Sequence, residues 1–263
     1  GYVHAAKRGI ARLARLLGDE ALATRLEGAA TALAARFEAR FWLADLGRYA
    51  MALDGAKRPV DALGSVGGHL LWSGTAPEHA AQLEEQLLGP ALFNGWGVRT
   101  LAADAAGYNP LGYHIGTVWP HDTAIAAAGL KAYGRHDGAT RLAQALLESA
   151  QFFPGYRLPE LFCGFDRAAT MVPVAYPTAC SPQAWAAGAP FLLLRTLLGL
   201  EARSDERELR ILHPTLPPWI RRLTIHDLRV GDASVDLLFH RWRGMTAAEL
   251  LSRTGDLTVS VRL

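Results

Sequence analysis

The sequence predicts a mainly α protein with about seven helices, most of them paired in hairpins, and a small antiparallel β region at the C-terminus. Three observations support this fold class. Apolar residues recur every three or four positions through most of the first 200 residues. Long segments rich in glycine, proline and aromatic residues separate one helix pair from the next. From Leu209 onward, apolar residues alternate in short runs between glycines, which is typical of strands.

The first predicted hairpin comprises residues 6–17 and 19–42. Apolar residues form a stripe along both segments, and the stripe is longest in the second. Gly18 and Asp19 between them supply a helix stop followed by an N-cap. Residues 45–59 then predict a loop, with a short strand pair as the alternative. The remaining helices are expected at residues 60–72 and 77–88, 120–133 and 138–153, and 182–198.

The loops are expected to carry the function. Helix hairpins joined by long connections tend to stack in one layer, which would gather the connections at one end and line a cleft with them. The longest connection, residues 154–180, is of a length that is usually functional within a compact domain. On this basis we expect residues 1–204 to form the helical part and residues 205–263 a small β-rich C-terminal extension.

Composition excludes several classes of partner. The 263 residues are 50% hydrophobic and carry a formal net charge of +2, without a run of basic residues among aromatic ones, so we expect neither a nucleic-acid nor a membrane partner. Only two cysteines occur, Cys163 and Cys180, which fits a reducing compartment, and we expect a cytoplasmic protein. The chain opens at Gly1 without a methionine, which suggests a piece of a longer protein.

The segment from Gly107 to Asp122 holds the densest group of aromatic and polar side chains. Its glycines and prolines disfavour both a long helix and a regular strand, so we expect a shaped loop that ends at a helix N-terminus. Flat apolar faces beside hydrogen-bonding edges suit a polyhydroxylated ligand. The alternative is that Tyr113 and Trp119 are half-buried core residues.

If the loops meet, several acids and bases become available. The candidates are Asp54, Asp61, Asp122, Glu160, Asp166, His114 and His121. Glu160 is the strongest, because it lies between Pro159 and two apolar residues, in surroundings able to shift a carboxyl pKa by desolvation. Glycoside hydrolysis needs two carboxyl groups flanking the bond, about 6.5–9.5 Å apart in inverting enzymes. The alternative for Glu160 is a surface charge that caps a turn.

Other chemistries fit the sequence less well. A zinc site built from Cys163, Cys180 and either His114 or His121 lacks the paired spacing of known zinc motifs, so we expect no metal. The sequence contains neither a glycine-rich phosphate loop nor a nucleophile elbow, and we expect no cofactor.

An ordered series of short motifs resembles the C-terminal half of bacterial glycogen-debranching-enzyme-like proteins of the amylo-alpha-1,6-glucosidase type. The segments that carry the resemblance are Ala50–Gly55, Arg58–Asp61, Gly68–Trp72, Gly95–Leu101, Tyr108–Pro110, Tyr113–Asp122, Leu158–Phe165 and Ala179–Gly188. The resemblance implies a partial (α/α)6 toroid, the six-hairpin glycosidase fold, with its active site at the loop end. It also implies a glycosidase of carbohydrate metabolism that cleaves α-glucosidic linkages of glycogen- or starch-like oligosaccharides with inversion.

The resemblance further implies roles for the two carboxyl groups. In related toroidal glycosidases such as glucoamylase, the general base is a glutamate on the loop before the last long helix, where Glu160 stands here. The general acid of this family belongs to a Phe-Gly-Arg-Asp type motif in the earlier half, which this sequence does not contain. The partner would then be the missing N-terminal half of the barrel, and activity would depend on it.

We therefore predict Glu160 and Asp122 as catalytic residues. Asp122 has three possible roles, as a helix cap, a sugar ligand or the acid. The predicted substrate-binding residues are Trp96, Arg99, Tyr113, His114, Trp119, His121, Phe162, Gln183 and Trp185. Two alternatives stay open: a carbohydrate-binding protein without turnover, and a zinc-dependent α/α-toroid enzyme.

Overall fold

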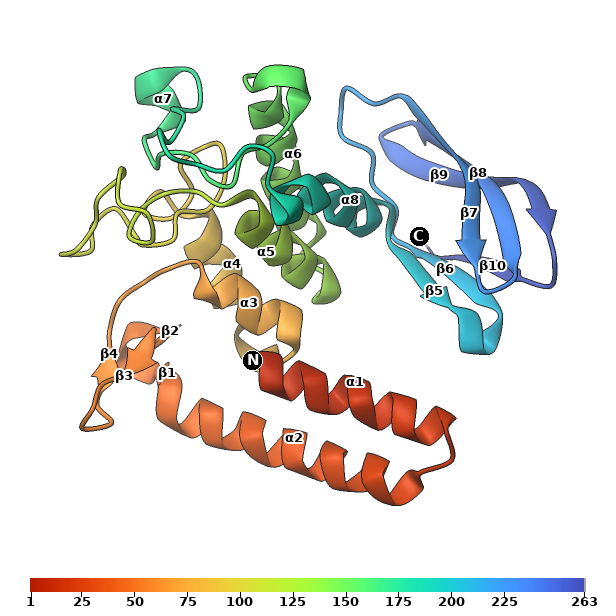
Figure 1. The fold of residues 1–263 in the computed structure, drawn as a ribbon, viewed down its shortest axis with the longest axis horizontal. Helices are drawn as coiled ribbons and strands as arrows, with labels where there is room; N and C mark the ends of the chain where they lie inside the picture. Colours follow the sequence, from red (N-terminus) through yellow and green to blue (C-terminus); the bar gives the residue numbers. More distant parts are fainter. Residues whose placement is uncertain (263) are drawn as a thin grey trace. The chain divides into compact units, whose positions relative to one another are not determined.

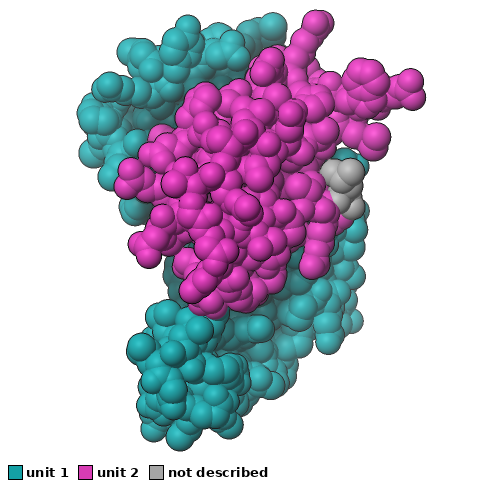
Figure 2. All heavy atoms as spheres, turned by 90° about the vertical axis from the view of Figure 1, so that its right-hand side faces the viewer, with its two compact units in different colours: residues 1–190 teal, residues 191–263 magenta. Residues whose placement is uncertain are grey.

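A computed structural model describes residues 1–262, so Leu263, the last residue of the predicted C-terminal extension, lies outside the described part. The chain divides into two compact units, Gly1–Pro190 and Phe191–Leu263, which are coloured teal and magenta in Figure 2. The seven expected helical segments are confirmed, most of them within a few residues at each end. The boundary expected at residue 204 stays a prediction.

The first unit opens with a helical hairpin. Helices α1 (Tyr2–Leu16) and α2 (Glu20–Phe41) lie side by side (Figure 1). Asp19 caps α2, because its side chain accepts a hydrogen bond from the backbone N–H of Leu22. Buried alanines at the contact allow the two helices to pack closely.

Short strands follow the hairpin in place of an open loop. They form two antiparallel pairs, β1 (Trp42–Leu43) with β2 (Arg48–Tyr49), and β3 (Ala52–Leu53) with β4 (Pro59–Val60). The strand pair given as an alternative for residues 45–59 is thus present. The next helix, which the sequence placed at residues 60–72, therefore begins only at Val66.

Helices α3 (Val66–Ser73) and α5 (Pro120–Ala132) pack closely against each other. Small residues explain it: a Cβ on Gly68 would lie 2.5 Å from the Cβ of Ala126, and one on Gly129 would lie 2.7 Å from the backbone nitrogen of Trp72. Because only glycine fits at these positions, the helix backbones approach each other closely, and side chains beside the glycines come within reach of the opposite helix. The other helices of this unit are α4 (Ala80–Leu88), α6 (His136–Ala150), α7 (Arg167–Thr170) and the first half of α8 (Ala184–Leu198).

The second unit consists almost entirely of strands. Strand β6 (Glu208–Leu212) pairs antiparallel with β5 (Leu200–Arg203) and parallel with β10 (Thr258–Arg262). Strands β7 (Arg222–Val230), β8 (Ala233–Trp242) and β9 (Met245–Thr254) form a second, antiparallel sheet. Both sheets contribute to one core, with Ile211 from the first and Phe239 from the second fully buried.

The predicted fold class, a mainly α partial (α/α)6 toroid with a small antiparallel β appendix, is wrong. Residues 1–262 contain ten strands in four sheets beside eight α-helices, and the C-terminal strands build a compact unit with its own core. Alternation along the sequence revealed that strands exist but not how they pair. Strands β6 and β10 are neighbours in one sheet although all three strands of the other sheet, β7–β9, come between them in the sequence. No local sequence pattern indicates this parallel pairing.

No helix within residues 1–262 combines the length and the apolar character that a membrane span requires.

Candidate functional site

Two long connections of the first unit, the one between α4 and α5 and the one between α6 and α8, meet at Val118. Its backbone pairs with Arg99 on one side and with Phe162 on the other, and Phe162 pairs in turn with Ala175. The contact is close: a Cβ on Gly164 would overlap the carbonyl oxygen of Gly116, so only glycine is accommodated there. The loops that the sequence singled out therefore form one connected surface.

Glu160 is a buried carboxylate on this surface, and both of its oxygens accept hydrogen bonds. The residue is 7% exposed. Tyr113 Oη donates to Oε1 at 2.7 Å, and the backbone N–H of Cys180 donates to Oε2 at 3.1 Å. These two donors, the tyrosine first, hold the pKa of Glu160 below its ordinary value. Hydrogen bonding to the charged form thus outweighs the desolvation that the sequence argument emphasised, and Glu160 is ionised at neutral pH.

The bond to Glu160 also acts on its partner. It raises the pKa of Tyr113 to about 12, since ionising the phenol would place a second negative charge beside the carboxylate. Tyr113 therefore remains a hydrogen-bond donor across the physiological range.

A row of aromatic rings extends from Tyr113; we call Tyr113, His114, Trp119, His121 and Trp185 the aromatic row. The ring centroid of Trp119 lies 4.9 Å from that of Tyr113 and 5.8 Å from that of His121. His114 stacks on Trp119, and His121 stacks on Trp185 with centroids 4.5 Å apart. Trp185 is 49% exposed, whereas Trp119 is buried and donates its N–H to the carbonyl oxygen of Tyr113. The row thus offers exposed ring faces on a buried support.

Asp122 lies at the other end of this row and belongs to a second hydrogen-bonded group. Its Oδ1 is bonded to Nε2 of His69 on α3, and Nδ1 of His69 is bonded to Tyr2 Oη on α1 at 2.6 Å. We call Tyr2, His69 and Asp122 the Asp122 cluster. Asp122 is 7% exposed, and its second oxygen, Oδ2, has no hydrogen-bond partner among the described residues. Trp119 is the N-cap of α5 and no side chain caps that helix, so the capping role considered for Asp122 is not observed.

Three other predicted sugar ligands lie in the interior. Arg99 is 1% exposed, and its guanidinium donates to the carbonyl oxygens of Gly164, Pro90 and Ala91 and to the Asp166 carboxylate. Trp96 and Phe162 are also fully buried. All three side chains hold the loops together and are not presented to solvent.

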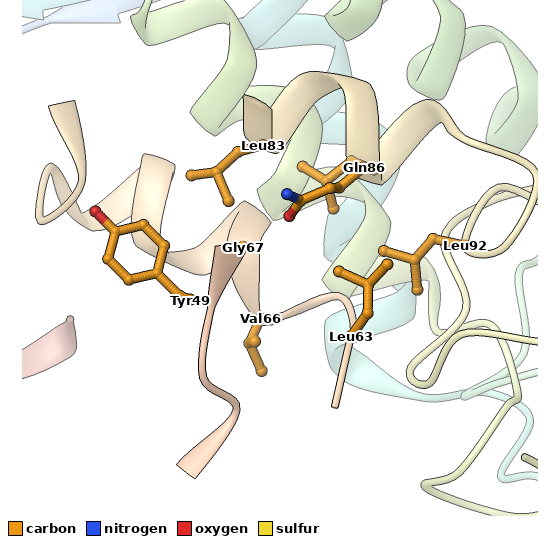
Figure 3. Close-up of a pocket in the computed structure, with 9 residues that line it drawn as sticks. Tyr49, Leu63, Val66, Gly67, Leu83, Gln86 and Leu92 are labelled. Carbon is orange, nitrogen blue, oxygen red and sulfur yellow. The ribbon is translucent and has the colours of Figure 1, made fainter. Parts of the chain in front are cut away.

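Gln183 faces a hollow of about 260 Å³ at the start of α8, together with Leu158 and Pro182. A second cavity lies below the first turn of α3, between Tyr49, Leu83 and Gln86 (Figure 3). Its volume of about 10 Å³ is room for a single water molecule, so it is no sugar site.

The two cysteines differ in solvent exposure. Cys163 is buried, with Sγ 3.6 Å from the carbonyl oxygen of Ala175, and Cys180 is exposed beside Glu160. Within residues 1–262, no three side chains of the His, Cys, Asp and Glu types converge as a metal site would require.

Sequence reasoning missed His69 and Tyr2 as members of a site. A signal existed for His69, because it follows Gly67-Gly68 in a predicted helix, and such glycines often mark close approach of another backbone. Tyr2 has no comparable signal. It reaches His69 only because α1 packs near α3, a contact between residues 67 positions apart.

Taken together, these contacts hold Glu160 against Tyr113 at one end of the aromatic row, and Asp122 follows His121, another member of the row. Glu160, ionised and held by two donors, can accept a proton from a water molecule. The exposed rings of Tyr113 and Trp185 offer flat faces on which a sugar ring can stack.

Comparison with known proteins identifies the family. Residues 1–156 match the mannosylglycerate hydrolase MGH1-like glycoside hydrolase domain. No curated protein matches the sequence significantly.

Solved structures share the fold at low sequence identity. A sialidase superposes with a TM-score of 0.75 over 98% of this chain at 14% identity, and a GH78 family rhamnosidase from a Bacillus species with a TM-score of 0.70 over 98% at 16% identity. A GH63 mannosylglycerate hydrolase from Thermus thermophilus, in complex with glucose, superposes with a TM-score of 0.59 over 72% at 23% identity.

The first two superpositions include the C-terminal strands, which supports treating the β unit as part of the shared fold. The chain spans 25% of the length of the sialidase and of the rhamnosidase, and 42% of the mannosylglycerate hydrolase. The family match supports a glycoside hydrolase domain and does not extend to glycogen debranching.

Proposed function

The chain belongs to the mannosylglycerate hydrolase MGH1-like glycoside hydrolase family, and from this premise we propose that it hydrolyses an α-glycosidic bond with Glu160 as the general base. In the proposed reaction, Glu160 accepts a proton from water while the water oxygen attacks the anomeric carbon. The bond to the leaving oxygen breaks on the opposite face, which inverts the anomeric configuration. A carboxylic acid protonates that leaving oxygen.

One observation carries the proposal: a buried glutamate whose two oxygens are held by Tyr113 and Cys180 at the edge of an aromatic row. A base must be ionised to act, and the lowered pKa of Glu160 meets that requirement. The same donors orient the carboxylate, and the ring of Tyr113 places a sugar-stacking surface against it.

We assign sugar binding to Gln183 and to the aromatic row, in which the buried Trp119 supports the other four side chains. Arg99, Trp96 and Phe162 then support the site from within, because their side chains are fully buried. The proposal places the general base and the sugar-binding residues of this chain within residues 1–204 and treats residues 205–263 as the C-terminal extension.

The proposed substrate is an α-glucoside, either a branched glycogen- or starch-like oligosaccharide or a small glycoside. The small-glycoside option draws support from the Thermus thermophilus hydrolase, a mannosylglycerate hydrolase that was crystallised with glucose. For the proton donor, we propose a carboxylic acid from sequence outside these 263 residues, with Asp122 as the alternative within the chain.

The test compares Glu160→Gln with the unaltered sequence, both within a longer chain that also supplies the proposed proton donor, on three substrates: an α-1,6-branched glucan, α-mannosylglycerate and p-nitrophenyl α-glucoside. Loss of a general base is expected to lower kcat/KM by about 10²- to 10⁴-fold on whichever substrate is cleaved. Proton NMR of the first-formed product should reveal the β anomer. Glu148→Gln is the matched control, because Glu148 also accepts side-chain hydrogen bonds, from Arg167 and Gln144, away from the aromatic row.

Two outcomes would contradict the proposal. Undiminished turnover by Glu160→Gln would remove Glu160 from the reaction. Sugar binding without any hydrolysis, even by the unaltered longer chain, would instead favour a carbohydrate-binding protein.

A further inference from the structure

The Asp122 cluster contains a buried charge that the fold satisfies only in part. Asp122 is only 7% exposed, and just one of its two oxygens has a partner among residues 1–262. An unsatisfied buried acceptor destabilises a fold, and more so when it is charged. A fold that retains such a group next to the aromatic row leaves an acceptor that a donor on a ligand could satisfy.

The two side chains behind Asp122 fix its orientation. His69 uses both ring nitrogens, one for Asp122 Oδ1 and the other for Tyr2 Oη. A carboxylate only accepts hydrogen bonds, so Nε2 of His69 carries the proton that is donated to Asp122. In a neutral ring, Nδ1 then has no proton and accepts a hydrogen bond from the Tyr2 hydroxyl. Asp122 therefore fixes the histidine tautomer, Tyr2 restrains the ring from its other nitrogen, and the histidine holds Oδ1 so that Oδ2 stays unengaged.

The contact between α3 and α5 keeps this arrangement rigid. Asp122 and Ala126 are one turn apart on α5, and Ala126 packs against Gly68, the residue before His69. A larger residue at position 68 would separate the helices and with them the two bonded side chains. The close packing and the hydrogen bond therefore depend on each other.

Neighbouring groups connect the cluster to the aromatic row. His121 follows Trp119, stacks on Trp185 and lies close enough to Asp122 and His69 for both to act on it. Burial is the main cause of its lowered pKa, which Asp122 opposes and His69 reinforces. Its Nδ1 is, like Oδ2 of Asp122, buried without a hydrogen-bond partner among the described residues.

We propose that Tyr2 and His69 are positioning residues that hold Asp122 so that its free oxygen, Oδ2, accepts a hydrogen bond from a sugar hydroxyl. The proposal rests on the proposed function for the class of ligand. Oδ2 is closed to solvent, so sugar binding also requires a neighbouring side chain to rotate. Two exposed side chains could make this movement. Trp185 is 49% exposed and stacks on His121, and Tyr2 is 56% exposed and is hydrogen-bonded to His69.

The test measures binding of methyl α-D-glucopyranoside and its 2-, 3-, 4- and 6-deoxy analogues to the 263-residue chain by calorimetry. The proteins compared are the unaltered chain, Asp122→Asn, His69→Gln and Tyr2→Phe. Asp122→Asn is expected to weaken binding of the parent glucoside by about 10- to 100-fold, the equivalent of one hydrogen bond to a charged group. The other two variants are expected to weaken it less, by about 3- to 20-fold, because Asp122 remains but is held loosely.

The deoxy series separates positioning from general damage. One analogue, the one without the hydroxyl that Asp122 contacts, should bind all four proteins with equal affinity. A structural defect would weaken every analogue alike. Tyr2→Phe removes one oxygen from a half-exposed side chain and should fold even if His69→Gln does not.

The outcomes also separate this inference from the proposed function. Glu160→Gln could abolish hydrolysis while no deoxy analogue binds all four proteins with equal affinity. This result would support the proposed function and overturn the role of Asp122. A selective deoxy series without hydrolysis would keep the binding role and overturn the enzyme. Failure of the unaltered chain to bind any glucoside counts against the inference.

Discussion

Two clusters in residues 1–190 contain the same three kinds of side chain in a different order. In the Asp122 cluster, the histidine stands in the middle and one carboxylate oxygen is left without a partner. In the Glu38 cluster, made of Glu38, Tyr49 and His79, the carboxylate stands in the middle. Tyr49 Oη donates to one oxygen of Glu38 at 2.5 Å, and His79 Nε2 lies 3.0 Å from the other.

The surroundings of the two clusters differ as much as their order. Tyr49 lines the cavity of about 10 Å³, which is too small for a sugar, and Trp42 stacks on His79 with ring centroids 3.4 Å apart. The Asp122 cluster adjoins the aromatic row instead. A carboxylate with both oxygens engaged joins α2 to the segments that pack on it, whereas a half-engaged one retains binding capacity. Hydrogen-bond satisfaction, more than residue type, therefore distinguishes a structural cluster from a candidate site.

The largest expected contrast comes from removing the two carboxylate charges. Glu38→Gln should lower the free energy of unfolding by about 1–2 kcal/mol, because both neighbours lose a charged partner, and should leave glucoside affinity unchanged. Asp122→Asn should change the free energy of unfolding by less than about 1 kcal/mol, since it also removes a buried charge that is only half paired. Urea unfolding of both variants at pH 7 measures the difference. Equal destabilisation would mean that Asp122 is as structural as Glu38.

A smaller contrast is expected from the two tyrosines. Tyr49 is 5% exposed, and Tyr49→Phe leaves a carboxylate oxygen of Glu38 without its donor, for an expected loss of about 1 kcal/mol. Tyr2 is 56% exposed, so Tyr2→Phe should cost no more than about 0.5 kcal/mol. Thermal unfolding monitored by circular dichroism ranks the pair. The opposite ranking would contradict the distinction between the clusters.

The smallest effect concerns the titration of Tyr2. Burial and then the charge of Asp122 raise the pKa of this phenol above 10, so its neutral form is favoured in the folded chain. Any stability from this shift is present below pH 10 and is lost as the pH rises through the raised value. Asp122→Asn should lower the pKa of Tyr2, and Glu38→Gln should leave it unchanged. NMR of ¹³C-labelled tyrosine follows both, and an unshifted Tyr2 in Asp122→Asn would show that the two residues are not coupled.

Much of the candidate site follows from local sequence. The glycine- and proline-rich stretch before Pro120 had to be a loop, and its aromatic residues do gather there beside Glu160. Which aromatic residues are exposed was not predictable. Trp96 and Trp185 look alike in sequence, yet one is 1% and the other 49% exposed, because exposure depends on what packs from elsewhere in the chain.

The sequence by itself determined the seven long helices, the loops between them and the presence of C-terminal strands, because helical periodicity, alternation and glycine or proline breaks act over a few residues. Only the tertiary structure decided the parallel pairing of β10 with β6 and the contact of His69 with Asp122, 53 positions away. Both depend on surfaces that meet only after the elements have formed. The half-satisfied carboxylate at Asp122 arises at that stage, from the way α1, α3 and α5 pack together.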